Sequence, residues 1–63
     1  MKEEKNDEIK MLDCVMAISD LKKNVKKGEV GAVVDIFGDR FLIDFSNDPS
    51  KLIDVAIDEI KKI

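Results

Sequence analysis

The sequence contains no histidine, tyrosine or tryptophan, and its 63 residues include one cysteine, one proline and three glycines. Without histidine, the usual proton carrier near neutral pH is missing, and zinc sites built from cysteine and histidine cannot form. The single cysteine, Cys14, excludes a disulfide within the chain. No serine, cysteine or lysine stands in a recognisable nucleophile motif. These absences predict that the protein is not an enzyme and holds no cofactor.

Acidic pairs are the remaining candidates for metal chemistry. Asp54 with Asp58, or Asp35 with Asp44, could in principle bind a hard cation. No calcium-loop spacing accompanies either pair, so we interpret both as solvated polar positions and predict no metal site. Cys14 stands in an apolar segment, "CVMA", and we therefore expect its thiol to be buried and unreactive.

Long hydrophobic runs are also lacking. No apolar stretch approaches the ~20 residues of a membrane-spanning helix, and the first eleven residues lack the apolar core of a signal peptide. We therefore expect a soluble cytoplasmic protein that does not bind membranes. A chain of 63 residues forms one domain and buries only about 60 % of its unfolded surface. Nearly every large apolar side chain must lie inside this domain or beneath a partner.

The charge that is present is banded along the chain. The net charge is −3, yet residues 21–34 contain four lysines and a single acid, Glu29. Residues 35–59 contain seven acids against one arginine and one lysine. The lysine cluster consists of Lys22, Lys23, Lys26 and Lys27. This banding predicts opposite electrostatic character in two parts of one small surface.

The N-terminal half divides into a leader, a strand and a loop. Residues 1–10 are nearly all polar and are interpreted as a flexible charged leader. Residues 11–18, "MLDCVMAI", favour a strand, although some of their apolar spacing would also suit a helix. Residues 19–29 lack periodicity and predict a loop in which Leu21 and Val25 point inward.

A β-hairpin is predicted over residues 30–45, because two β-type runs flank the turn dipeptide Gly38-Asp39. Alternation gives it the core candidates Ile36, Phe41, Ile43 and Phe45. Asp35 and Asp44 are expected nearly opposite each other and facing water. Gly31 inside the first strand indicates a bulge or a close approach of backbones, which leaves open whether Val33 or Val34 points inward.

The C-terminal segment allows two interpretations. Residues 46–50, "SNDPS", predict a turn. Residues 52–63 then suit either a helix starting after Asp48-Pro49 or a strand followed by one helical turn at residues 58–61. The β-branched residues at the start of this segment favour the strand slightly.

The run "KKGEVGAVVDIFGDRFLIDF" resembles the core hairpin of small SH3-like barrels, in particular a family of short uncharacterised bacterial domains, and is similar to the KOW motif of ribosomal and transcription proteins. The resemblance extends over residues 11–63 and depends on Gly28, Val30, Gly31, Val33, Val34, Ile36, Ile43 and Phe45. It implies an all-β domain at 11–63: a five-stranded barrel with a one-turn helix near the C-terminus. The absence of Tyr and Trp argues against the aromatic groove that holds proline-rich peptides.

By elimination, we expect a non-catalytic module that binds another protein, as an immunity-type, inhibitor-type or accessory subunit; self-association into a homodimer is possible on the same surface. Candidate contacts are an apolar pair, Phe37 and Leu42, and acids including Asp35, Asp39, Asp44 and Asp48. The alternative is a KOW-like RNA- or ribosome-associated module that uses the lysine loop at residues 22–27, because lysines that neutralise phosphates release counterions.

Overall fold

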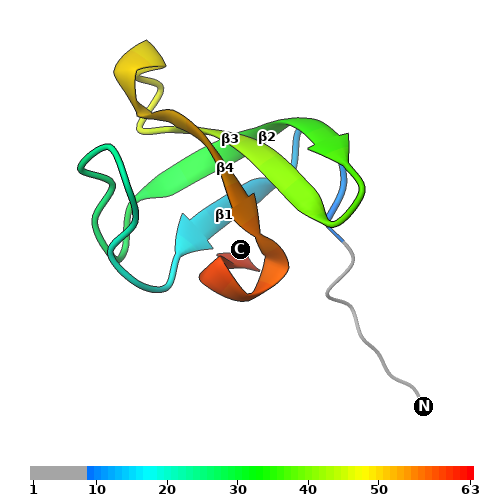
Figure 1. Cartoon of the computed structure of the whole chain (residues 1–63), viewed down its shortest axis with the longest axis horizontal. Coiled ribbons are helices and arrows are strands. Elements are labelled where there is room, and N and C mark those ends of the chain that lie inside the picture. Colours follow the sequence, from blue (N-terminus) through cyan, green and yellow to red (C-terminus); the bar gives the residue numbers. More distant parts are fainter. Residues whose placement is uncertain (1–8) are drawn as a thin grey trace.

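A computed structural model describes residues 9–63, and all statements about the structure concern this part of the chain. Five antiparallel strands form one sheet in the order β4-β3-β2-β1-β5 (Figure 1). The strands are β1 (Cys14–Ala17), β2 (Val30–Phe37), β3 (Arg40–Phe45), β4 (Leu52–Ala56) and β5 (Ile60–Lys62). Two short 3-10 helices, η1 (Pro49–Lys51) and η2 (Ile57–Glu59), precede β4 and β5. The all-β prediction is confirmed.

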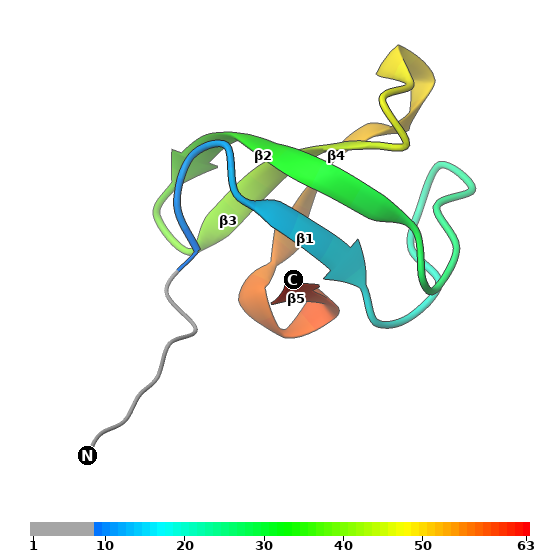
Figure 2. The same cartoon turned by 180° about the vertical axis from the view of Figure 1, so that it is seen from behind.

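The sheet must curl strongly, because its two edge strands are consecutive in the chain. Five flat strands spaced about 4.8 Å apart would hold β4 and β5 about 19 Å apart. The link between them is η2, and four steps of a 3-10 helix advance only about 8 Å. Figure 2 shows β5 beneath the curved β1–β2–β3 layer. Hydrogen bonds join neighbouring strands of the sheet in four pairs, and β4 and β5 are its two edge strands.

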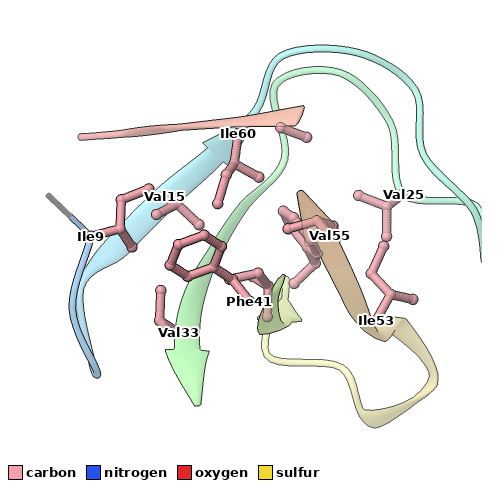
Figure 3. Close-up of a cluster of buried hydrophobic side chains, with 11 residues drawn as sticks. Ile9, Val15, Val25, Val33, Phe41, Ile53, Val55 and Ile60 are labelled. Atoms are coloured by element: carbon pink, nitrogen blue, oxygen red, sulfur yellow. The ribbon is translucent and has the colours of Figure 1, made fainter. Parts of the chain in front are cut away.

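The core lies on the concave face of this sheet. Its members alternate along the strands, as period-two side chains do when one face is buried, and Figure 3 shows them converging from every strand. They are Ile9, Val15, Ala17, Val25, Val33, Phe41, Ile43, Phe45, Ile53, Val55 and Ile60, with Leu21 and Ile36 packed against them. Three of the four predicted hairpin core residues are thus fully part of it, and Ile36 is half-buried. Val25 and Leu21 point inward as expected.

A bulge sets the register of the hairpin. Val33 pairs with Ile43 and Asp35 pairs with Leu42, so Val34 is the extra residue. Val33 therefore points inward and Val34 outward. Asp35 does not lie opposite Asp44, whose partner in the register is Ala32, and that expectation was wrong.

Gly31 marks a close approach of backbones rather than the bulge itself. A Cβ atom at this position would lie 2.7 Å from Ile43 Cγ2, 2.8 Å from the Asp44 carbonyl oxygen and 2.9 Å from Phe45 Cα. These separations are shorter than carbon contacts allow. The glycine is therefore required for the tight pairing of β2 with β3.

The C-terminal segment is strand, turn and strand, so the helix interpretation is wrong. β4 is followed by the 3-10 turn at Ile57–Glu59, one residue earlier than the predicted turn, and then by the short β5. Asp48 begins η1 instead of a long helix: its carboxylate accepts a hydrogen bond from the Ser50 backbone N–H at 3.0 Å, with Pro49 in the first turn. The Glu59 carboxylate accepts one from the Ala56 N–H at 2.8 Å and fixes the start of η2.

The first strand is shorter than predicted. Residues Lys10 to Asp13 form a turn in which the Asp13 N–H donates to the Lys10 carbonyl at 3.1 Å, and Leu12 has φ +71°. Before the turn, Ile9 is 8 % exposed and packs into the core. Ile9 belongs to the stretch interpreted as leader, so the packed unit reaches back at least to this residue. Residues 1–8 of that stretch lie outside the described residues.

The part of the chain that the structure describes holds no helix with the length and hydropathy needed to cross a bilayer.

Candidate partner-binding face

The convex side of the sheet carries an ordered set of side chains, which we call the outer face. Residues paired across antiparallel strands share a face, so the register assigns its members. One row is Leu52, Asp44, Ala32 and Cys14, and the next contains Asp54, Leu42 and Asp35. The flanking rows are Val30 with Met16 and Lys61 at one end, and Phe37 with Arg40 and Ala56 at the other. Bulged Val34 adds a further outward side chain.

The outer face is unusually apolar for the solvent side of an antiparallel sheet, where polar residues are the rule. Phe37 is 48 % exposed, and Val30, Val34 and Leu52 are exposed as well. Leu42 is half-buried between Asp35 and Asp54 in the register. The predicted apolar pair, Phe37 and Leu42, therefore lies on one face, within an apolar area larger than predicted.

An ion-pair cluster closes one side of the outer face. Arg40 Nη2 lies 2.7 Å from Asp54 Oδ2, and Lys22 Nζ lies 3.0 Å from Asp54 Oδ1. The hydrogen bonds from Arg40 and then Lys22 lower the pKa of Asp54 to about 2, and the Asp54 carboxylate raises the pKa of Arg40. Asp54 thus interacts with two cations, one from β3 and one from the loop before β2.

The other predicted acids form no ion pair among residues 9–63. The Asp35 carboxylate accepts a hydrogen bond from the Ile36 N–H at 2.8 Å and forms no ion pair. Asp44 is half-buried between Ala32 and Leu52 in the register, and its enclosed Oδ1 atom has no hydrogen-bond partner in the described chain. Asp39 is exposed at the hairpin turn. Asp48 is committed to capping η1, and the hydrogen bonds from the Ser50 backbone and hydroxyl lower its pKa.

The structure divides the predicted lysine cluster. Lys22 turns toward β4 and pairs with Asp54. Lys23, Lys26 and Lys27 are exposed, and none of these three side chains forms an ion pair within residues 9–63. Three cations, rather than four, are therefore free to contact another molecule.

Glu29 holds the lysine loop in place, a role that sequence reasoning missed. Its carboxylate accepts hydrogen bonds from the Ser46 hydroxyl at 2.6 Å, from the Lys26 N–H at 2.8 Å and from Lys51 Nζ at 3.1 Å. These bonds, that of Ser46 first, lower the pKa of Glu29 to about 2. The available signal was its position as the single acid among residues 21–34. The Glu29 carboxylate therefore links the loop before β2, the turn after β3 and η1 through hydrogen bonds.

Cys14 is exposed, which contradicts the expectation of a buried thiol. Val15 and Ala17 take the inward positions of β1, so alternation directs Cys14 to the outer face. Within residues 9–63, no group of three or more side chains has a metal-binding arrangement. The outer face of the described residues thus combines exposed apolar side chains with carboxylates.

The fold and the outer face define a small all-β domain with one strongly curved five-stranded sheet. The chain belongs to the family described as "Domain of unknown function (DUF4926)", whose profile matches residues 11–56. The match includes β1 to β4 and ends before η2 and β5. No curated protein and no solved structure matches the chain. The SH3-like and KOW-like resemblance stays a prediction.

Proposed function

We propose that this chain is a non-catalytic protein-binding module that docks to one partner protein through the outer face, as an inhibitor-type, immunity-type or accessory subunit. The observation that carries the proposal is the exposure of Phe37, Val30 and Leu52 on a sheet face that also bears carboxylates without cations. Exposed apolar patches with a polar rim are characteristic of interaction sites. The lack of histidine and of a nucleophile motif supports the non-catalytic part of the proposal.

The finer fold assignment belongs to the same proposal. The short η2 link between the edge strands supports an SH3-like barrel, since it draws the two edges of the sheet toward each other. The aromatic content of the outer face is limited to Phe37, which supports docking to a folded protein rather than to a proline-rich peptide. We further propose that the partner is a cytoplasmic protein.

The alternative function is an RNA- or ribosome-associated module. The observation in its favour is the set of three exposed lysines, Lys23, Lys26 and Lys27, held on a loop that Glu29 fastens. No arginine or aromatic side chain belongs to residues 19–29, so this surface would bind phosphates without stacking on bases.

Affinity purification of the tagged chain from its native cell tests the two functions together. We expect one stoichiometric protein partner that survives nuclease treatment, is lost with Phe37→Asp and is retained with Ile57→Asp. Ile57 is the matched control, because it is exposed to a similar extent, 47 % against 48 %, but lies in η2 outside the outer face. Thermal unfolding must show both variants folded.

Three outcomes contradict the proposal. Retention of the partner by Phe37→Asp removes the outer face from binding. Unfolding of Phe37→Asp shows that this side chain is part of the core. Recovery that is sensitive to nuclease, falls steeply with salt and is abolished by Lys26→Glu with Lys27→Glu favours the RNA alternative.

A further inference from the structure

The two ends of the outer face carry opposite charge. At the end where β2 begins, Lys26 and Lys27 precede Val30, and Lys61 lies beside Met16 in the register. At the far end of β2, Asp39 lies in the hairpin turn and Asp35 lies in the strand just before it. None of these five charged side chains forms an ion pair within the described residues. The eight residues of β2 separate the two ends by about 25 Å at roughly 3.3 Å per residue.

Apolar side chains make up most of the region between these ends, and the half-buried Asp44 lies among them, between Ala32 and Leu52 in the register. Val30, Ala32 and Val34 follow one another along β2, and Leu52 and Leu42 lie alongside on the neighbouring strands. Two of the five are half-buried and three are exposed. A mainly apolar centre between a basic end and an acidic end is complementary to itself when one copy is turned end for end against another.

Within residues 9–63, no other segment covers this region, and Val30, Val34 and Leu52 are exposed. Residues 1–8, "MKEEKNDE", are polar apart from Met1 and cannot supply a matching apolar surface. A chain this short, without a disulfide, has a small core, and oligomerisation is one of the few remaining ways to stabilise it. A second copy is also present wherever the first is made.

We infer that, when no other partner is bound, a second copy of this chain covers the outer face through a two-fold axis, which sets the lysine end of each copy over the hairpin end of the other. The inference rests on the proposed function only in that it uses the same face. A closed two-fold pair uses the patch once on each copy and leaves no open apolar surface for further growth. A partner protein would then bind by displacing the second copy.

Sedimentation equilibrium of the intact chain measures the association directly. We expect the 7.1 kDa chain to approach twice that mass as its concentration rises toward about 1 mM. Cys14 provides an internal reporter, because it is exposed on the outer face next to Ala32 in the register. Its alkylation by iodoacetamide should slow over the same concentration range in which the mass doubles.

Charge reversal tests the end-for-end arrangement. The variant Asp35→Lys with Asp39→Lys, and separately the variant Lys26→Glu with Lys27→Glu, each set like charges together in a self-pair. Each should dissociate at least about tenfold more readily than the wild type at low salt. An equimolar mixture of the two variants should regain the double mass, since every contact between the unlike copies is again between opposite charges. Ile57→Asp, outside the face, should leave the association unchanged.

A chain that stays at 7.1 kDa up to about 1 mM overturns the inference, as do variants that associate like the wild type or a mixture that does not recover. These failures are distinguishable from failure of the proposed function. A monomeric chain whose Phe37→Asp variant is folded and loses its cellular partner supports the proposed function without the second copy. A dimer whose Cys14 stays fully reactive associates elsewhere, which overturns the two-fold pairing on this face.

Discussion

Both faces of the single sheet carry large apolar side chains, but the two faces differ in how far those side chains are buried. The concave face presents Val15, Val33, Ile43 and Phe45, all fully buried. The convex face presents Val30, Leu42 and Phe37, which remain exposed or half-buried. Apolar content alone therefore does not say which side of a strand forms the core. The register and the direction of curling decide it, because only the concave side can enclose its own side chains.

A matched pair of phenylalanines provides the strongest test of this difference. Phe45→Ala on the concave face should cost about 3–5 kcal/mol and leave so small a domain largely unfolded. Phe37→Ala on the convex face should change stability by only about 0.5 kcal/mol. Urea denaturation followed by far-ultraviolet circular dichroism measures both. Equal losses in the free energy of unfolding would show that the two phenylalanines contribute equally to the core, which contradicts the expected difference between the faces.

The packing between β2 and β3 offers the next largest effect. Gly31→Ala introduces a Cβ atom 2.7 Å from Ile43 Cγ2 and 2.8 Å from a backbone oxygen, so the strands must separate. We expect a loss of about 1–3 kcal/mol, measured by thermal unfolding. Gly38→Asn is the control, because φ +63° at the hairpin turn suits asparagine and no atom lies within 4 Å of the added Cβ. A neutral Gly31→Ala would mean that the close approach is not required.

The loop at the basic end of the convex face should respond to acid through Glu29. Its pKa in the folded chain, about 2, is lower than the ordinary value of 4.5. The stabilisation is therefore complete above about pH 4.5 and is lost as the pH falls toward 2. Glu29→Gln should lower the melting temperature at pH 7 and flatten its dependence on pH between these limits.

Asp58→Asn is the control for Glu29, since the exposed Asp58 carboxylate has no hydrogen bond or ion pair within residues 9–63. A Glu29→Gln variant with the pH dependence of the wild type would remove Glu29 from this role.

The smallest expected effect is a gain in stability at Leu12. This side chain is 77 % exposed, and its φ of +71° belongs to the left-handed region that leucine disfavours. Leu12→Asn keeps the hydrogen bond from the residue 12 N–H to the Val33 carbonyl, 2.8 Å in the present chain, and suits that backbone better. We expect about 0.5–1 kcal/mol of added stability by chemical denaturation. A loss would indicate that the leucine side chain contributes contacts to the fold.

Much of the fold was predictable from local patterns. The β-branched runs on either side of Gly38-Asp39 identify the hairpin, and the alternation of Phe41, Ile43 and Phe45 identifies its buried face. The strand character of residues 52–56 was favoured by propensity, but the choice against a helix depended on pairing with β3, a contact between distant parts of the chain.

The errors arose where the register mattered. The two-residue turn pairs Phe37 with Arg40 and thereby places Asp35 opposite Leu42, two positions away from Asp44. The bulge at Val34 then shifts the earlier part of β2 by one position, so that Asp44 pairs with Ala32. Cys14 was expected inside because its neighbours are apolar, yet its outward position follows from the alternation of Val15 and Ala17. Of the outer face, sequence analysis identified Phe37 and Leu42 but missed Val30 and Leu52. The alternation from Ile53 places Leu52 outward, provided that β4 is known to be a strand.

The boundaries of the family profile, residues 11–56, lie inside the hydrophobic cluster rather than around it. Ile9 enters that cluster from before the first strand, and Ile60 enters it from the last one, opposite Ala17. A fragment trimmed to the profile would lose both isoleucines. It would also lose β5, which pairs with β1 (Cys14–Ala17). Any expression clone intended to represent this family should therefore be designed outward from the packing, with several residues retained on each flank.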